Sequence, residues 1–145
     1  DIVSTAKGLG GGLPIGATMF GNKTAEVLTP GSHGSTFGGN PVCCAGAVSI
    51  LNRIDDALLA DVKAKSEYII SELSACEGVV AVDGMGLMLG AKLKTKKAGD
   101  VVKKAVENGV IVLTAKEKLR FLPPLTISFA EIDKGIEILK GLLTE

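Results

Sequence analysis

A lysine followed by a run of glycines lies near the start of the chain, in the segment STAKGLGGGLPIG at residues 4–16. A lysine amine is a nucleophile only when it is neutral, and a free lysine is almost wholly protonated at neutral pH. Burial or the chemistry of a bound group must therefore favour the uncharged amine if Lys7 is reactive. The adjacent glycines would let the main chain approach a planar ligand closely. The segment thus indicates either a reactive lysine or a surface lysine beside a flexible loop.

Nucleotide-binding loops are also rich in glycine, but their spacing differs from the spacing here. The dinucleotide fingerprint needs glycine at its first, third and sixth positions, and counting from Gly8 puts Leu13 sixth. Counting from Gly10 puts Ile15 there. The P-loop has its lysine after the glycines, whereas Lys7 precedes them. If Lys7 is reactive, the geometry suits a Schiff base with a carbonyl cofactor such as pyridoxal phosphate, with the amine later moving protons at the reacting carbon.

An arginine lies between apolar residues in the segment LRFLPP at residues 119–124. A guanidinium in such surroundings requires a partner, and its planar fork matches a carboxylate. Arg120 is therefore a candidate for binding a substrate carboxylate, and an ion pair within the protein is the alternative. The single histidine, His33, lies in a loop rich in glycine and serine, where we interpret it as a loop residue and not as a general base.

These candidate residues must be positioned by short alternating elements. Turn residues and apolar periodicity predict strands at residues 1–5 and 16–21, a loop at 28–40, a helix that starts at Pro41 and a second helix that starts at Asp55 or Asp56. Further strands are predicted at 79–83, 86–93, 110–114, 119–122 and 125–128, with helices at 98–108 and after a capping box formed by Ser128 and Glu131. The order β-β-α-β-β-α predicts a compact α/β unit over residues 78–145.

Composition excludes several classes of protein. The 16 basic and 16 acidic residues give a net charge of zero, which argues against binding to nucleic acid. No apolar run is long enough to cross a membrane, and the beginning of the sequence does not resemble a signal peptide, so we expect a cytoplasmic protein. Cys43, Cys44 and Cys76 lack the spacing of a metal site, so we expect no metal and interpret them as packing residues.

Four segments in order resemble the class III pyridoxal-phosphate-dependent aminotransferases. They are DIVSTAKGLGGGLPIGA at residues 1–17, HGSTFGGNP starting 26 residues after Lys7, VDGMGLMLGAKL at 82–93 and LRFLPPLTIS at 119–128. The resemblance implies the C-terminal part of a fold-type I α/β transferase. Residues 1–40 would be a remnant of the large cofactor-binding domain, 41–77 linking helices and 78–145 the small domain. Many relatives carry arginine where this chain has Asp83.

The resemblance also implies the roles of individual residues. Lys7 would be the catalytic residue and would bind pyridoxal 5'-phosphate. Thr36 would bind the cofactor phosphate from the neighbouring subunit of a homodimer. A hydroxyl and the amides of a glycine-rich turn suit such an anion. Ser35 and Arg120 would contact the substrate.

The implied activity is the transfer of an amino group between N-acetylornithine and 2-oxoglutarate in arginine biosynthesis. Ornithine, succinylornithine or 4-aminobutyrate as donor remains an alternative, as does a non-catalytic interaction module. In such enzymes the aspartate that pairs with the pyridine nitrogen and the aromatic residue that stacks on the ring precede the lysine. We therefore expect the isolated chain to be inactive.

Overall fold

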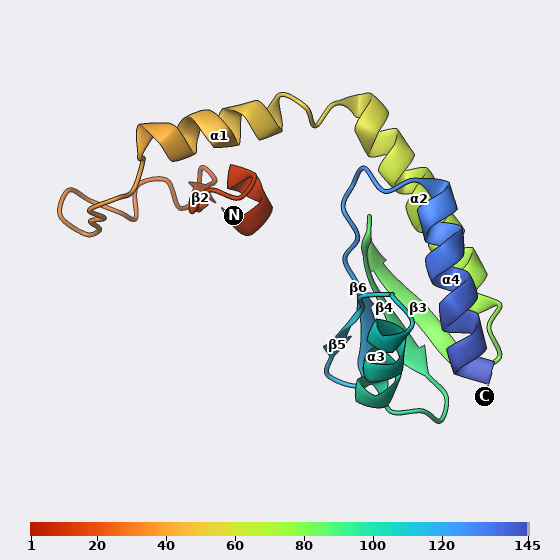
Figure 1. Cartoon of the computed structure of the whole chain (residues 1–145). Coiled ribbons are helices and arrows are strands. Elements are labelled where there is room, and N and C mark those ends of the chain that lie inside the picture. Colours follow the sequence, from red (N-terminus) through yellow and green to blue (C-terminus); the bar gives the residue numbers. More distant parts are fainter. Residues whose placement is uncertain (145) are drawn as a thin grey trace. The chain divides into compact units, whose positions relative to one another are not determined.

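In the computed structural model, which describes residues 1–144, the chain divides into two units, Asp1–Asp55 and Asp56–Glu145 (Figure 1). The boundary falls inside the segment 41–77 that the sequence assigned to linking helices. Helix α2 (Asp56–Ser74) belongs to the second unit because its apolar residues Val62, Ile69 and Leu73 are buried in the core of that unit. Each unit is described separately below.

The first unit contains a β-hairpin, a glycine-rich turn and one helix. Strands β1 (Ile2–Thr5) and β2 (Ala17–Phe20) pair antiparallel, with Ile2 opposite Phe20. Between them lies the short 3-10 helix η1 (Lys7–Gly10). Helix α1 (Pro41–Leu51) starts at the predicted proline, and the side chain of Asn40 caps it by accepting hydrogen bonds from the amides of residues 42 and 43. The predicted strands, loop and helix start of this unit are confirmed.

Helix α1 and the glycine-rich turn approach each other closely because both lack bulky side chains at the contact. A Cβ atom on Gly46 would lie 2.7 Å from a methyl carbon of Leu13 and 3.2 Å from the carbonyl oxygen of Gly10. A Cβ atom on Gly11 would lie 2.8 Å from a methyl carbon of Ile50. Real Cβ atoms do not approach other atoms so closely, so glycine at these two positions permits the contact. The run of small residues in α1 thus holds the turn that begins at Lys7.

The second unit is a four-stranded antiparallel sheet with helices on one face. Its strands are β3 (Val79–Met85), β4 (Met88–Leu93), β5 (Leu113–Ala115) and β6 (Lys118–Phe121), in the order β3-β4-β6-β5. Helix α3 (Ala98–Glu107) connects β4 to β5, and helix α4 (Phe129–Thr144) follows β6. The predicted order β-β-α-β-β-α is confirmed.

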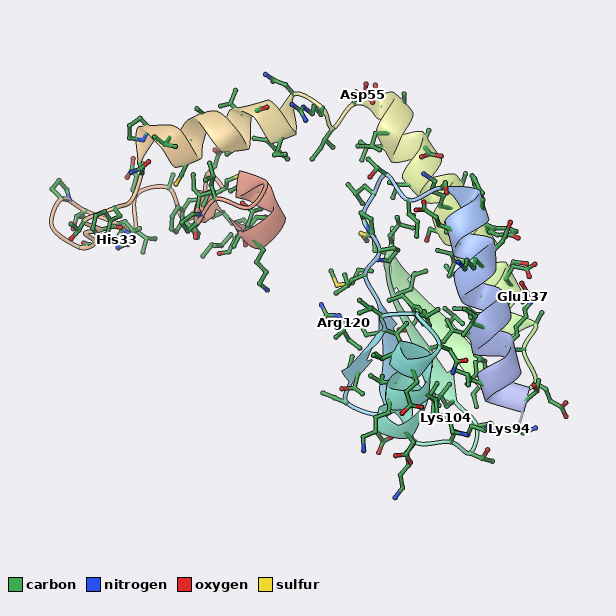
Figure 2. The ribbon with its side chains drawn as sticks, viewed as in Figure 1. His33, Asp55, Lys94, Lys104, Arg120 and Glu137 are labelled. Carbon is green, nitrogen blue, oxygen red and sulfur yellow. The ribbon has the colours of Figure 1, made fainter. Side chains whose placement is uncertain are left out.

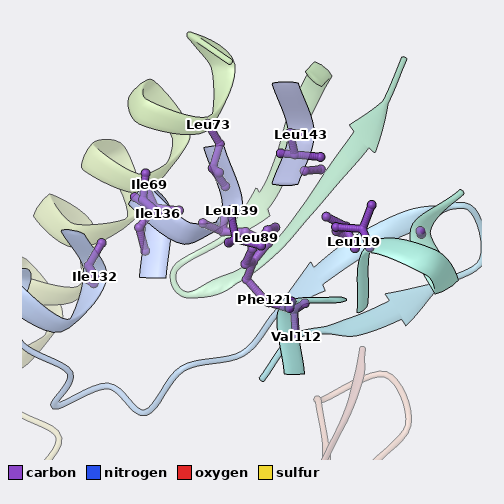
Figure 3. Packing of buried hydrophobic residues seen from close by; sticks show 14 of the residues in the cluster. Ile69, Leu73, Leu89, Val112, Leu119, Phe121, Ile132, Ile136, Leu139 and Leu143 are labelled. Carbon is purple, nitrogen blue, oxygen red and sulfur yellow. The ribbon is translucent and has the colours of Figure 1, made fainter. Parts of the chain in front are cut away.

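The core of the second unit joins the inner face of the sheet to the helices (Figure 3). Leu89 and Leu119 project from the sheet and are almost completely buried, as is Leu73 from α2. The predicted apolar stripe of α4 is confirmed, since all four of its members are buried: Ile132, Ile136, Leu139 and Leu143. Helices α2 and α4 lie side by side, and the Lys140 amine donates to the Glu72 carboxylate at 2.6 Å.

Two strand predictions need correction. Residues 125–128 form no strand, because Pro123 and Pro124 remove amide donors and the amide of Ile127 turns back to the Pro124 carbonyl at 3.0 Å. Ser128 instead caps α4: its hydroxyl accepts from the Glu131 amide, and the Glu131 carboxylate accepts from the Ser128 amide at 2.8 Å. The predicted strand at 110–114 is reduced to β5, because the Val110 amide bonds to the last turn of α3 at 2.8 Å.

Tyr68 connects α2 to α4 through a polar contact. Its hydroxyl donates to the Asp133 carboxylate at 2.5 Å, and its ring meets Phe129 edge to face with centroids 5.6 Å apart. The hydrogen bond to Asp133, burial and the negative charges of Asp133 and Glu72 raise the pKa of Tyr68 from 10.0 to about 12. Because the folded state holds this proton more tightly than the unfolded state, the stabilisation is present below pH 10 and is lost as the pH rises from about 10 through about 12.

The single tyrosine of the sequence makes this pKa directly measurable, because tyrosinate absorbance then reports Tyr68 alone. We expect a titration midpoint near pH 12 in the folded chain and a midpoint closer to the ordinary value of about 10 in Asp133→Asn. Asp100→Asn, on the exposed start of α3, should leave the midpoint unchanged. A midpoint that Asp133→Asn does not move would contradict the contact.

The contact between α1 and the glycine turn predicts a position-specific response to added volume. Gly46→Val should destabilise this contact by about 1–3 kcal/mol, because the new side chain overlaps Leu13 and the Gly10 carbonyl. Hydrogen exchange at the amides of Gly11 and Leu13, which close the turn onto Gly8 and Gly10, should then be faster.

Ala45→Val is the matched control, since it places the same branched side chain at the exposed neighbouring position of α1. Equal acceleration of exchange in both variants would show that a valine anywhere in this part of α1, and not the close contact at position 46, is responsible.

Candidate functional site

Lys7 opens the 3-10 turn η1 in a conformation that is uncommon for a lysine. Its φ angle is +59°, and Lys116 is the other non-glycine residue with positive φ in the part of the chain that the structure describes. Such a conformation costs of order 1–3 kcal/mol and persists where the surroundings impose it. The turn is closed behind Lys7 by Gly11 at φ +60°, whose amide donates to the Gly8 carbonyl at 3.1 Å. The same turn packs against α1 through Gly10, Gly11 and Leu13.

The Lys7 side chain is exposed, and no hydrogen bond or ion pair to it is present within residues 1–144. Lys23, in the same unit, contrasts with it, because its amine lies 3.7 Å from the Asp1 carboxylate. An exposed amine with no protein partner is accessible to an aldehyde. Because Lys7 is not buried, the chemistry of a bound group would have to favour the uncharged amine that the reaction requires.

Ser35 and Thr36 lie in the exposed loop between β2 and α1. The Ser35 side chain folds over Gly38, where a Cβ atom would lie 2.7 Å from the Ser35 hydroxyl oxygen. Gly31 and Gly39 have positive φ angles of +87° and +71°, as a tightly curved loop requires. The Thr36 hydroxyl accepts or donates no hydrogen bond within the described chain. A free hydroxyl in a loop of exposed amides suits an anionic group such as a phosphate.

A hollow of about 540 Å³ in the first unit lies beside the hairpin, between β1, β2 and the loop. Thr5, Gly16, Ser32 and His33 are among the residues that line it. Neither Lys7 nor Thr36 contributes to this lining, and no hydrogen bond joins Lys7 to Ser35 or Thr36 in the described residues. Lys7, Ser35 and Thr36 thus all lie in the first unit, but no hydrogen bond joins Lys7 to either of the other two.

Arg120 belongs to the second unit and lies on the face of the sheet opposite the core. Its neighbours Leu119 and Phe121 point into the core, so the alternation along β6 places Arg120 on the other face, as Figure 2 shows. We call this face the open face; its side chains include Met85, Met88 and Leu113, which are 87%, 55% and 48% exposed.

The partner of Arg120 is a sulfur atom and not a carboxylate. The guanidinium Nη2 donates to the Met88 Sδ at 3.7 Å, and no carboxylate lies within ion-pair distance of Arg120 among residues 1–144. A thioether is a weak acceptor, so most of the five guanidinium N–H donors remain available. Of the two interpretations left open by the sequence, the geometry disfavours an internal ion pair. Met88 was not identified from the sequence, because its contact depends on the register of β4 against β6.

The described residues also bear on metal binding, on membrane-spanning helices and on the cysteines. No group of three or more His, Cys, Asp or Glu side chains that could hold a metal ion occurs in the described residues. None of the helices in the described chain is long and apolar enough to cross a membrane. All three cysteines are free; burial raises the pKa of the Cys76 thiol, which disfavours the reactive thiolate.

Comparisons with known proteins identify the family of the chain. The family model for class III aminotransferases matches residues 1–143. The chain is 43% identical to the acetylornithine aminotransferase of Haemophilus ducreyi over 146 residues, covering all of this chain and 37% of that protein. It is also 43% identical to the acetylornithine aminotransferase of Aquifex aeolicus over 144 residues, covering 99% of this chain and 38% of the relative. The chain thus spans well under half the length of the curated relatives it matches.

Solved structures give the same result. The ornithine aminotransferase of Plasmodium yoelii matches with a TM-score of 0.85 at 30% identity, covering 99% of this chain and 40% of that one. The N-acetylornithine aminotransferase of Stenotrophomonas maltophilia matches with a TM-score of 0.84 at 32% identity, covering 99% and 39%. These neighbours have the fold-type I architecture, and this chain has the mixed α/β structure of a part of it. The chain belongs to the class III aminotransferases, a family whose cofactor is pyridoxal 5'-phosphate.

Proposed function

We propose that the protein containing this chain is a pyridoxal-phosphate-dependent aminotransferase that moves an amino group between N-acetylornithine and 2-oxoglutarate. The observation that carries the proposal is the accessible amine of Lys7, at the start of a turn with positive φ that packs against α1. The 43% identity to proteins named acetylornithine aminotransferase supports this amino donor and, with it, a place in arginine biosynthesis. A cytoplasmic location of the enzyme is part of the same proposal.

Each candidate residue then has a defined role. Lys7 would hold the cofactor through Nζ, and its amine would take and return the proton at the carbon that carries the amino group. Thr36 would donate a hydrogen bond from its hydroxyl to the cofactor phosphate. Ser35 contacts the substrate, and Arg120 binds a substrate carboxylate. When bound, pyridoxal phosphate supplies an aldehyde that combines with amines and a conjugated ring that withdraws electrons from the reacting carbon.

The domain roles follow the same proposal. Residues 1–40 would contribute to a large cofactor-binding domain, residues 41–77 would link the domains and residues 78–145 would form the small domain. Thr36 would reach the cofactor of the neighbouring subunit, which makes the intact enzyme a homodimer. Because the chain spans 37–38% of the length of its relatives, we assign turnover to the whole protein and expect the 145-residue chain alone to be inactive.

A second candidate is the transfer of an amino group from ornithine. Structural matches to ornithine aminotransferases, with TM-scores up to 0.85, suggest it, although acetylornithine aminotransferases match equally well. Succinylornithine and 4-aminobutyrate require the same cofactor chemistry. These alternatives differ in the donor, so the roles of Lys7 and Thr36 are common to all of them.

A covalent trapping experiment tests the role of Lys7. The chain is incubated with pyridoxal phosphate and reduced with borohydride, and the modified peptides are identified by mass spectrometry. We expect modification predominantly at Lys7, its loss in Lys7→Ala and its persistence in Lys23→Ala, the control in the same unit. Inorganic phosphate should compete with pyridoxal phosphate and so reduce the modification of Lys7. This reduction should be smaller in Thr36→Val than in the wild type, because the variant lacks the hydroxyl that donates to the phosphate.

Modification spread evenly over surface lysines, with no preference for Lys7, would contradict the proposal and favour a non-catalytic interaction module.

A further inference from the structure

The open face of the second unit has one row in which an acid and an arginine are aligned. The strand register places Asp83 of β3 opposite Gly90 of β4, and Gly90 opposite Arg120 of β6. Leu113 of β5 completes the row. Adjacent strands are about 4.8 Å apart, so Asp83 and Arg120 are separated by two strand spacings, or about 10 Å between backbones.

Gly90 leaves the space between Asp83 and Arg120 free of any side chain on β4. A Cβ atom at Gly90 would lie 3.3 Å from Cδ of Lys118 and 3.8 Å from Oδ1 of Asp83. The Lys118 side chain therefore crosses β4 directly above Gly90. Its amine donates to Oδ2 of Asp83 at 2.5 Å.

Asp83 would otherwise be available to Arg120. A guanidinium can pair with a carboxylate through two parallel hydrogen bonds, which a thioether cannot offer. The long side chain of Arg120 could extend over the uncovered Gly90 toward Asp83, just as that of Lys118 does. An Arg120–Asp83 pair would occupy the guanidinium, and the carboxylate would repel an incoming anion.

We infer that Lys118 is a positioning residue that holds Asp83 away from Arg120 and so keeps the guanidinium available to a substrate carboxylate. The inference rests on the proposed role of Arg120 in carboxylate binding. It adds to that role a condition specific to this chain: the site works because the acid at position 83 already has a partner. Lys118 touches neither substrate nor cofactor in this arrangement and acts only through Asp83 and Arg120.

Lys92 supplies a matched control for the charge of Lys118. It is directly opposite Lys118 on β4 and carries the same charge on the open face. It forms no ion pair with Asp83 in the described structure. Removing Lys92 lowers the charge of this face as much as removing Lys118, but leaves the Lys118–Asp83 pair in place.

The test uses nuclear magnetic resonance of the Arg120 Nε–H group in the full 145-residue chain, at low ionic strength. Without any anion, Lys118→Met should shift this resonance and slow its exchange with water, because Arg120 now pairs with Asp83. Adding Asp83→Asn to Lys118→Met should return both properties to the wild-type values. Lys92→Met should leave them unchanged. An Arg120 resonance that is the same in Lys118→Met and in the wild type would overturn the inference.

Titration with 2-oxoglutarate, used as a dicarboxylate probe, gives the second readout. The half-saturating concentration at Arg120 should rise about threefold in Lys118→Met, the size expected for competition by a solvent-exposed ion pair, and fall back in the double variant. An equal rise in Lys92→Met would mean that overall charge is responsible, which overturns the inference. If 2-oxoglutarate does not shift the Arg120 resonance in any variant, the proposed role of Arg120 in carboxylate binding is wrong. The spectra recorded without anion still test separately whether Arg120 pairs with Asp83 when Lys118 is removed.

Discussion

A sheet covered by helices on one face only determines which side chains of the second unit can take part in chemistry. Because successive residues of a strand point to opposite faces, burying Leu119 and Phe121 forces Arg120 onto the open face. A shift of β6 by one residue would bury the guanidinium and expose two large apolar side chains. The packing of the core therefore fixes the orientation of Arg120 more firmly than any contact that its own side chain makes.

Close backbone contact has a similar role in the first unit, where there is little apolar core. Gly46 in α1 and Gly11 in the turn allow helix and turn to approach at distances that a side chain would prevent. Lys7, at the start of the same turn, has a positive φ angle, a conformation that its own side chain disfavours. The glycines around Lys7 are thus part of a packed contact as well as of an accessible surface, which favours a shaped turn over the flexible loop that the sequence left as an alternative.

Local signals in the sequence were sufficient for most elements, and relations between strands were not. The Ser128–Glu131 capping box and the Pro41 helix start depend on residues close together in sequence, and both are confirmed. The strand predicted at 125–128 is wrong because the apolar alternation there competes with two prolines and with a helix cap, and the cap prevails. Lys7, Ser35, Thr36 and Arg120 could be selected from motifs. The Met88 contact and the Lys118–Asp83 pair could not, since they exist only once the register of β3, β4 and β6 is known.

The chemistry of Arg120 also bears on how the proposed enzyme would select its amino donor. N-acetylornithine, ornithine, succinylornithine, 4-aminobutyrate and 2-oxoglutarate all carry a carboxylate, so an arginine on the open face suits each of them. Binding energy that is equal for all candidate donors gives no discrimination between them. Selection would therefore depend on groups that contact the parts in which the donors differ, such as an acetyl amide in place of a charged amine. Keeping Arg120 free of Asp83 would strengthen binding of all these substrates alike, so the Lys118–Asp83 pair would govern affinity for carboxylates and leave the choice of donor to those other contacts.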